Sequence, residues 1–163
     1  MNNYFSKETC YINCELKSSD DLFDFVGKEM EAKGYAKEGF AESLKLREKN
    51  FPTALPGTDF AIAVPHTDPE FIKKPFVGIV TNIKPINFVQ MGSDNIIIKP
   101  RLFFILGFMK NEAIKYQVKI LQMIINKILV ENNGEIGKKL MVAKSADECM
   151  ELISVLEEQL HND

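Results

Sequence analysis

The spacing of apolar residues in the first part of the chain changes from the period of a strand to that of a helix. Residues 9–16 alternate between apolar and polar side chains, and residues 18–34 place apolar side chains three and four positions apart. Ser19 or Asp20 is the expected N-cap of this helix, and Gly34 is the expected stop. The pattern predicts a strand followed by an amphipathic helix.

A second helical pattern leads through a loop to a strand that carries a histidine at its end. Residues 37–50 have helical spacing through Phe40, Ala41, Leu44 and Leu46. The loop at residues 51–59 contains two prolines and a glycine, which end helices and favour turns. The run 59–70 then predicts an apolar strand that ends at His66 on a turn. There the imidazole is expected to meet molecules from outside the protein.

The middle of the chain is rich in residues that favour strands. Residues 75–83 and 95–108 are dense in branched and aromatic side chains. Within the second run, residues 103–108 are apolar throughout, as expected of a strand covered on both faces. Residues 86–91 predict a short strand or edge piece between the two runs.

From residue 111 onward the spacing is helical. One apolar stripe consists of Ile114, Val118, Leu121 and Ile125. Residues 133–144 predict a short helix or turn, and residues 145–160 predict a last helix. Ser145 and Glu148 are expected to form a capping box at its start.

Strands and helices alternate without repeats or linkers, which indicates one α/β domain over residues 1–163 with a core at about residues 9–158. A chain of 163 residues buries a sizeable core without disulfides. Its 20 basic and 23 acidic side chains give a net charge of -3, which disfavours nucleic acid as a partner. Because no apolar run approaches the roughly 20 residues of a membrane span, we expect a cytoplasmic protein without direct membrane insertion.

The three cysteines are expected to be reduced thiols. Cys10, Cys14 and Cys149 cannot all pair within one chain, and nothing in the sequence suggests export. With only two histidines elsewhere, no zinc pattern of four ligands assembles around Cys10 and Cys14. Cys149 has helical spacing with Leu152 and Ile153 and is interpreted as a small buried apolar residue.

His66 is the main candidate for chemistry. A neutral imidazole nitrogen is a good nucleophile at pH 7, and a phosphoryl group on it stays reactive enough to pass to a second acceptor. A guanidinium stabilises phosphoryl oxygens well because its fork binds two of them at once. Of the two arginines, Arg47 ends a helix just before the loop that leads to His66, whereas Arg101 opens an apolar run and marks its edge. Arg47 is therefore the better candidate.

Structural interpretations of His66 and Arg47 are equally consistent with their positions. A single histidine after a strand is more often a turn or surface residue than a nucleophile. A cation in the last turn of a helix is favoured by the helix dipole alone. The residues by themselves therefore allow a phosphoryl relay, or a binding or structural protein in which His66 carries no phosphate.

Residues 44–75 resemble the enzyme IIA component (EIIA) of the bacterial phosphoenolpyruvate-dependent sugar phosphotransferase system (PTS), in its fructose/mannitol class. That family has an Arg-Glu pair, a short loop with Thr and Gly, and an apolar strand that ends in Pro-His. The corresponding residues here are Arg47, Glu48, Thr53, Pro65 and His66. The extended PHTDP sequence after FPT is most similar to the galactitol-type branch, and the order of elements fits nearly the whole chain.

The resemblance implies both a fold and a function. The fold is a mixed sheet of about five strands flanked by helices on both faces. The function is that of a phosphocarrier: His66 accepts a phosphoryl group from the carrier protein HPr and transfers it to a cysteine of the cognate enzyme IIB (EIIB). The membrane enzyme IIC (EIIC) then imports a sugar or sugar alcohol, such as galactitol. Arg47 orients the phosphate, Thr53 lines the site and Glu48 orients Arg47, without a metal or organic cofactor.

One position departs from the family pattern. Members commonly have a second active-site histidine at the start of the helix after the long buried strand, in a pattern resembling His-x-Gln-Val-x-x-Leu. This chain has Lys115 there, with Gln117, Val118 and Leu121 in register. A lysine keeps a positive charge near a phosphate but lacks the titratable ring, and the alternative is an ordinary solvated residue. The departure is compatible with altered transfer, or with an EIIA-like regulatory module that is phosphorylated on His66 and controls a transcription factor or transporter.

Overall fold

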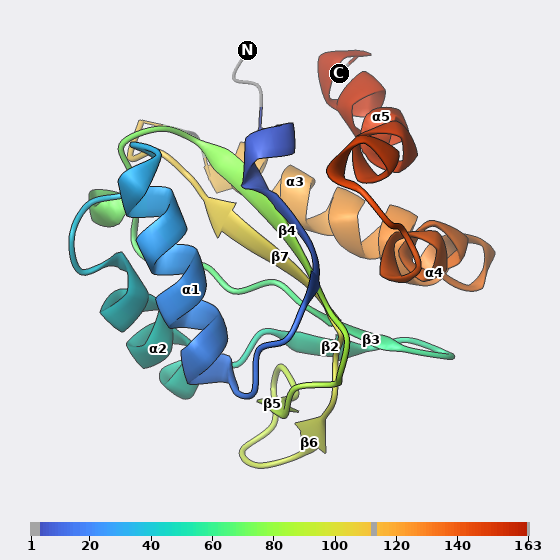
Figure 1. Cartoon of the computed structure of the whole chain (residues 1–163), viewed down its shortest axis with the longest axis horizontal. Helices are drawn as coiled ribbons and strands as arrows, with labels where there is room; N and C mark the ends of the chain where they lie inside the picture. The colour runs from blue at the N-terminus through green and yellow to red at the C-terminus, as the bar shows by residue number, and fades with distance from the viewer. Residues whose placement is uncertain (1–3, 112–113, 163) are drawn as a thin grey trace.

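A five-stranded mixed sheet forms the centre of the computed structural model, which describes residues 4–111 and 114–162 (Figure 1). The strands are β1 (Cys10–Cys14), β2 (Ala54–Pro56), β3 (Ala61–Ala63), β4 (Phe76–Asn82) and β7 (Leu102–Gly107). Their order across the sheet is β1-β4-β7-β3-β2. The pairs β1–β4 and β3–β7 are parallel, whereas β4–β7 and β2–β3 are antiparallel. The predicted mixed sheet of about five strands is confirmed.

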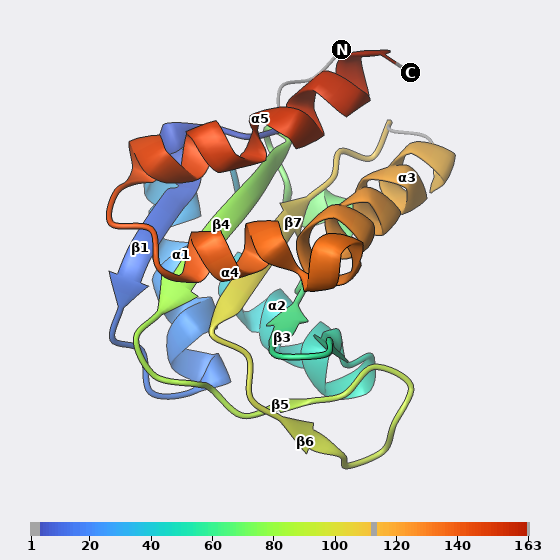
Figure 2. The ribbon, with the colours of Figure 1, turned by 90° about the vertical axis from the view of Figure 1, so that its right-hand side faces the viewer.

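Helices cover both faces of this sheet, as predicted. One face is covered by α1 (Ser19–Ala32) and α2 (Phe40–Asn50), and the other by α3 (Ile114–Ile124), α4 (Glu135–Met141) and α5 (Ala146–Asn162) (Figures 1 and 2). A π-helical turn (Ile125–Val130) continues α3, and short 3-10 turns lie at Lys7–Thr9, Pro69–Phe71 and Glu131–Asn133. A separate two-stranded sheet pairs β5 (Phe88–Val89) with β6 (Ile97–Ile98).

Strand β7 separates two hydrophobic cores, because its side chains alternate between the two faces. Phe103 and Ile105 lie in the core beneath α1 and α2, and Phe104 lies in the core beneath α3, α4 and α5. All three are fully buried, which confirms the prediction of a strand covered on both faces. The core also reaches beyond residues 9–158, since Tyr4 and Leu160 are buried.

The N-terminal helices agree with the prediction except at their ends. The N-cap of α1 is Ser18, not Ser19 or Asp20: its backbone is extended, and its hydroxyl accepts a hydrogen bond of 3.1 Å from the Asp21 N–H. Gly34 follows the helix with a φ of 81°, as expected of a stop. In α2, Phe40 and Leu44 are buried, but Leu46 is exposed.

The strand-rich run at residues 95–108 contains two strands, because Pro100 lacks an N–H and separates β6 from β7. One loop prediction needs correction. The predicted loop at residues 51–59 contains β2, whose residue Ala54 pairs with Ala63 of β3. The prolines in that loop suggested a break, but an edge strand tolerates proline because one of its sides needs no partner.

The apolar stripe predicted for α3 is only partly the buried one: Leu121 packs against the core, but the start of the stripe does not. Ile114 and Val118 are 77% and 44% exposed, and the buried residues of the helix are Ile120, Met123 and Ile124. The segment has apolar residues on two adjacent stripes, both with helical spacing, and packing against the sheet selects the second. The C-terminal helices are confirmed, and the Glu148 N–H donates to the Ser145 hydroxyl at 3.1 Å as the capping box predicts. Among the described residues, no helix is long and apolar enough to cross a membrane.

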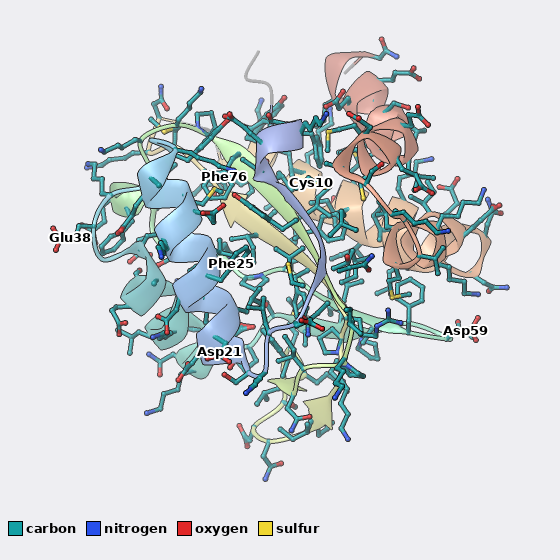
Figure 3. The ribbon with its side chains drawn as sticks, in the orientation of Figure 1. Cys10, Asp21, Phe25, Glu38, Asp59 and Phe76 are labelled. Atoms are coloured by element: carbon teal, nitrogen blue, oxygen red, sulfur yellow. The ribbon has the colours of Figure 1, made fainter. Side chains whose placement is uncertain are left out.

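The β2–β3 hairpin extends away from the sheet and is fastened to α4. Asp59 lies at the tip of the hairpin (Figure 3) and forms an ion pair with Lys138 of α4. Next to it, the Phe60 ring packs so closely on Gly137 that a Cβ there would lie 2.4 Å from the ring. These contacts fix the hairpin whose second strand leads to His66.

Candidate functional site

His66 is held by an extension of the parallel pairing between β3 and β7. Strand β3 ends at Ala63, before the predicted end, but the Leu106 N–H donates to the Pro65 carbonyl at 2.9 Å and His66 lies opposite Leu106 in an isolated bridge. The side chain is partly buried rather than fully exposed on a turn. The sheet therefore fixes the backbone of His66 although the residue lies outside the regular strand.

A pocket of about 440 Å³ opens beside His66. Three segments that are separate in the sequence form it: the end of α2 with the residues that follow, His66 three residues beyond the end of β3, and the turn between β5 and β6. The lining residues are Arg47, Asn50, Phe51, Pro52, Thr53, His66, Met91, Gly92, Ser93 and Asp94. Three of the predicted site residues, Arg47, Thr53 and His66, thus lie around one cavity.

The hydrogen bond of the His66 ring defines which nitrogen is nucleophilic. Nδ1 lies 2.9 Å from the backbone oxygen of Val64. A carbonyl oxygen only accepts, so Nδ1 carries the proton and Nε2 keeps its lone pair. Burial lowers the pKa of His66 below 6.5, and the positive charge of Arg47 lowers it further. The hydrogen bond to the Val64 carbonyl and the negative charge of Asp68 oppose this shift. The imidazole is therefore neutral at pH 7, with Nε2 as the free nucleophile.

The Arg47 guanidinium lies between an aromatic ring and a carboxylate. It stacks over Phe51 at 4.5 Å from the ring centroid, and Nη1 is 3.9 Å from Oδ1 of Asp68. Its Nε is buried and has no hydrogen-bond partner among the described residues. Arg47 also lines the pocket, where its cationic guanidinium suits an anionic oxygen.

Glu48 fastens Thr53 to the end of α2. The Thr53 hydroxyl and N–H both donate to Oε1 of Glu48, at 2.6 and 3.2 Å. Burial raises the pKa of Glu48 to about 7, although the two hydrogen bonds from Thr53 act in the opposite direction. The hydrogen bonds of Glu48 therefore shape the wall of the pocket through Thr53, a role that the sequence did not indicate.

A pair of hydroxyls connects α2 to the segment of His66. Ser43 lies one helical turn before Arg47, and its hydroxyl forms a hydrogen bond with the hydroxyl of Thr67. Thr67 is buried and directly follows His66. The pair thus joins the element that carries the guanidinium to the segment that carries the imidazole.

The family of the chain follows from a match along most of its length. The family model described as "Phosphoenolpyruvate-dependent sugar phosphotransferase system, EIIA 2" matches residues 3–155. The chain belongs to this EIIA family.

Curated relatives of this EIIA chain agree with that assignment over part of their length. The galactitol-specific EIIA component of Escherichia coli (strain K12) is 29% identical over 75 residues, which are 46% of this chain and 50% of that protein. The probable licABCH operon regulator of Bacillus subtilis (strain 168) is 29% identical over 87 residues, 53% of this chain and 13% of the regulator. The chain thus spans about half the length of the first of these relatives.

Solved structures show the same fold. A complex of enzyme IIAMTL and phosphorylated enzyme IIBMTL from Escherichia coli matches with a TM-score of 0.73 and 20% identity, over 92% of this chain and 98% of that one. The nitrogen regulatory protein IIA-Ntr from Neisseria meningitidis matches with a TM-score of 0.71 and 21% identity, over 91% and 95%. At these identities the likeness shows the EIIA fold alone.

Two cations of the EIIA chain lie apart from the pocket. Lys115, at the position of the second histidine in the family pattern, is exposed in the first turn of α3 and does not line the pocket. Arg101 donates from Nε to the Asn82 carbonyl at 3.1 Å and thus has the structural position expected of it. Within residues 4–111 and 114–162, no cluster of three His, Cys, Asp or Glu side chains has metal-binding geometry.

Several residues in and beside the pocket were missed in the sequence. Phe51 and Asp68 contact Arg47, and Met91 and Asp94 line the pocket, whereas Asp68 lies beside it. The first two lie within four residues of a predicted site residue, so proximity was a usable signal. The turn between β5 and β6 is 25 or more residues away from His66 in the sequence and has no signal of its own.

Proposed function

We propose that the protein is a phosphocarrier of the sugar phosphotransferase system, with the phosphoryl group carried on Nε2 of His66. The observation that supports this most directly is that His66, whose Nε2 keeps its lone pair, and the cationic side chain of Arg47 line the same pocket. The family match supplies the class of reaction. Arg47 orients the phosphoryl oxygens, and Thr53 lines the site.

The proposed transfer needs no further reactant. The phosphorus–nitrogen bond of the donor phosphohistidine breaks, and its electron pair remains on the donor nitrogen. The Nε2 lone pair of His66 forms the new bond to phosphorus, while Nδ1 keeps its proton on the Val64 carbonyl. The guanidinium neutralises charge on the transferring oxygens.

The proposed donor is HPr, and the proposed acceptor is a cysteine of an EIIB protein that works with a membrane EIIC. An EIIB partner is supported by the solved complex of a protein with the same fold. The pocket rim carries exposed apolar side chains, with Phe51 60% and Met91 37% exposed, which suits brief docking of two partners in turn. Galactitol is the proposed substrate of the system, on the basis of the curated relative.

Phosphorylation of the intact protein tests this function. The protein is incubated with phosphoenolpyruvate, enzyme I and HPr, and acid-labile phosphate is measured by intact mass. We expect one phosphoryl group on the wild type and none on His66→Ala. A wild type that stays unlabelled while a control EIIA is labelled contradicts the proposal, and a labelled His66→Ala moves the site to another residue.

A second candidate is an EIIA-like regulatory module that is phosphorylated on His66 and controls a transcription factor or transporter. The match to a probable operon regulator favours it, as does Lys115 at the position of the usual second histidine. The two functions differ in the fate of the phosphate. Transfer from the labelled protein to the cysteine of a galactitol-type EIIB supports the phosphocarrier, and label that is retained with every sugar-specific EIIB supports the regulator.

A further inference from the structure

Asp68 is the carboxylate that faces Arg47 at the edge of the His66 site. It lies two residues after His66, before the turn Pro69–Phe71, and its side chain is 65% exposed. Its Oδ1 is 3.9 Å from Nη1 of Arg47, a long contact between partly exposed groups. Asp68 makes no side-chain capping hydrogen bond to the turn that follows it. The carboxylate therefore has its charge available to act on the site.

The charges of Arg47 and Asp68 shift the pKa of His66 in opposite directions. Arg47 lowers the pKa of His66 and Asp68 raises it. A phosphoryl group on Nε2 is an anion, so the sign of each effect reverses: Arg47 attracts it and Asp68 repels it. The phosphoryl oxygens would also have to draw the guanidinium away from Asp68.

We propose that Asp68 sets the phosphoryl-transfer potential of His66, by competing for Arg47 and by repelling the phosphoryl oxygens. The proposal rests on the phosphocarrier function above. In the onward step the bond between Nε2 and phosphorus breaks, its electron pair returns to Nε2, and the acceptor thiolate forms the new bond. After the phosphoryl group has left, Arg47 interacts with Asp68 again. The Asp68 carboxylate therefore stabilises the unphosphorylated state of His66 and favours onward transfer.

Asp68→Asn tests the charge while keeping the shape of the side chain. Asp68→Glu keeps the charge, and Glu70→Gln removes a charge from an exposed residue of the same segment that does not line the pocket. Asp94→Asn removes a carboxylate that lines the pocket but is not among the charges that shift the pKa of His66. These variants distinguish a specific effect of Asp68 from a general loss of negative charge.

The measurement is the equilibrium of phosphoryl exchange between phospho-HPr and each variant, read as the ratio of the phosphorylated proteins by intact mass. For Asp68→Asn we expect a shift of roughly threefold to tenfold toward the phosphorylated EIIA chain, from one or two partly screened charge contacts. The shift should shrink at high salt. Asp68→Glu should lie near the wild type, and Glu70→Gln and Asp94→Asn should shift the ratio less.

The outcomes separate this proposal from the phosphocarrier function. If the wild type takes up phosphate but Asp68→Asn leaves the exchange ratio unchanged, Asp68 does not set the transfer potential. Equal changes of the forward and reverse rates at an unchanged ratio would make Asp68 a docking contact and overturn the proposal. A wild type that takes up no phosphate overturns both proposals together.

Discussion

At the scale of single residues, the site depends on a hydrogen bond that no sequence pattern predicts. The apolar run that ends in Pro65 and His66 made the histidine a candidate, the place of Arg47 in its helix made the arginine another, and both line one pocket. The protonation of the ring depends on the Val64 carbonyl and on burial, and both follow from the way the chain passes beneath the pocket. The chemical state of a residue is a property of its surroundings, which only the fold supplies.

The lowered pKa of His66 predicts the pH dependence of phosphoryl uptake. If the neutral ring of His66 is the nucleophile as proposed, the uptake rate should fall as the ring is protonated, with a midpoint below pH 6.5, the ordinary value of histidine. The rate is measured with preformed phospho-HPr across the pH range, beside a control acceptor that corrects for changes in the donor. A midpoint at or above pH 7 would contradict the prediction.

Glu48 predicts a second pH dependence, in stability. Its folded pKa of about 7 lies above the ordinary 4.5, so the folded state binds a proton more tightly than the unfolded state. The stability from this group is fully present below pH 4.5 and is lost as the pH rises through 7. Glu48→Gln keeps an oxygen for Thr53 and removes the titration, so its urea midpoint should fall less than that of the wild type between pH 5 and 8.

The exposed Glu38 provides the matched control for Glu48. Glu38→Gln also removes one negative charge, but from a solvated position, and should leave the slope of stability against pH as in the wild type. Parallel slopes for Glu48→Gln and the wild type would show that Glu48 is ionised normally.

At the scale of elements, spacing predicted which segments are helices but not which face each helix buries. In α3 two adjacent apolar stripes both have helical spacing, and the buried set of Ile120, Met123 and Ile124 is decided by the sheet. In the same way, Pro100 divides the strand-rich run at residues 95–108 into β6 and β7, and β2 formed where prolines suggested a loop. The local sequence pattern limits which residues can be buried, and tertiary packing decides which of them are.

Close packing of α1 on α2 yields a prediction at this scale. A Cβ at Gly27 would lie 2.6 Å from the Cβ of Ala41, so Gly27→Ala should force the helices apart and cost about 2 kcal/mol of folding free energy. Ala41→Gly alone should cost about 1 kcal/mol through helix propensity. In the double variant the clash is largely removed, so its loss should be smaller than the sum of the two.

Urea denaturation of the two single variants and the double variant measures this coupling. The sum of the losses of unfolding free energy in the two single variants should exceed the loss in the double variant. Strict additivity would mean that the two helices already have room for the extra methyl group. Phosphoryl uptake by Gly27→Ala tests the link to function, because α2 carries Arg47.

At the scale of the whole molecule, the order of the strands was beyond the reach of sequence spacing. Alternating strands and helices indicated an α/β domain, and the resemblance to the EIIA family supplied a mixed sheet. The position of β7 between β4 and β3 depends on pairings between residues far apart in the chain. Pocket residues from β5–β6 were missed for the same reason, since only the assembled fold brings the turn at residues 91–94 to His66.

The two cores that meet at β7 predict how the molecule unfolds. Phe103→Ala leaves a cavity under α1 and α2, and Phe104→Ala leaves one under α3, α4 and α5. Each ring is fully buried, so each variant should lose about 3–5 kcal/mol of folding free energy. Because both cores share β7, far- and near-ultraviolet circular dichroism should report one common transition in both variants. Separate transitions would mean that the two faces unfold independently.

The bridge between His66 and Leu106 has a consequence for the order in which the protein becomes competent during synthesis. A ribosome has translated Arg47, Thr53 and His66 well before it reaches Leu106, the residue whose N–H holds the Pro65 carbonyl. A nascent chain that ends before β7 therefore contains the nucleophile and its guanidinium but lacks the strand that aligns them. If His66 carries the phosphoryl group as proposed, we expect such a truncated chain to accept no phosphate, and phosphoryl uptake to begin only after the middle of the sheet has been made.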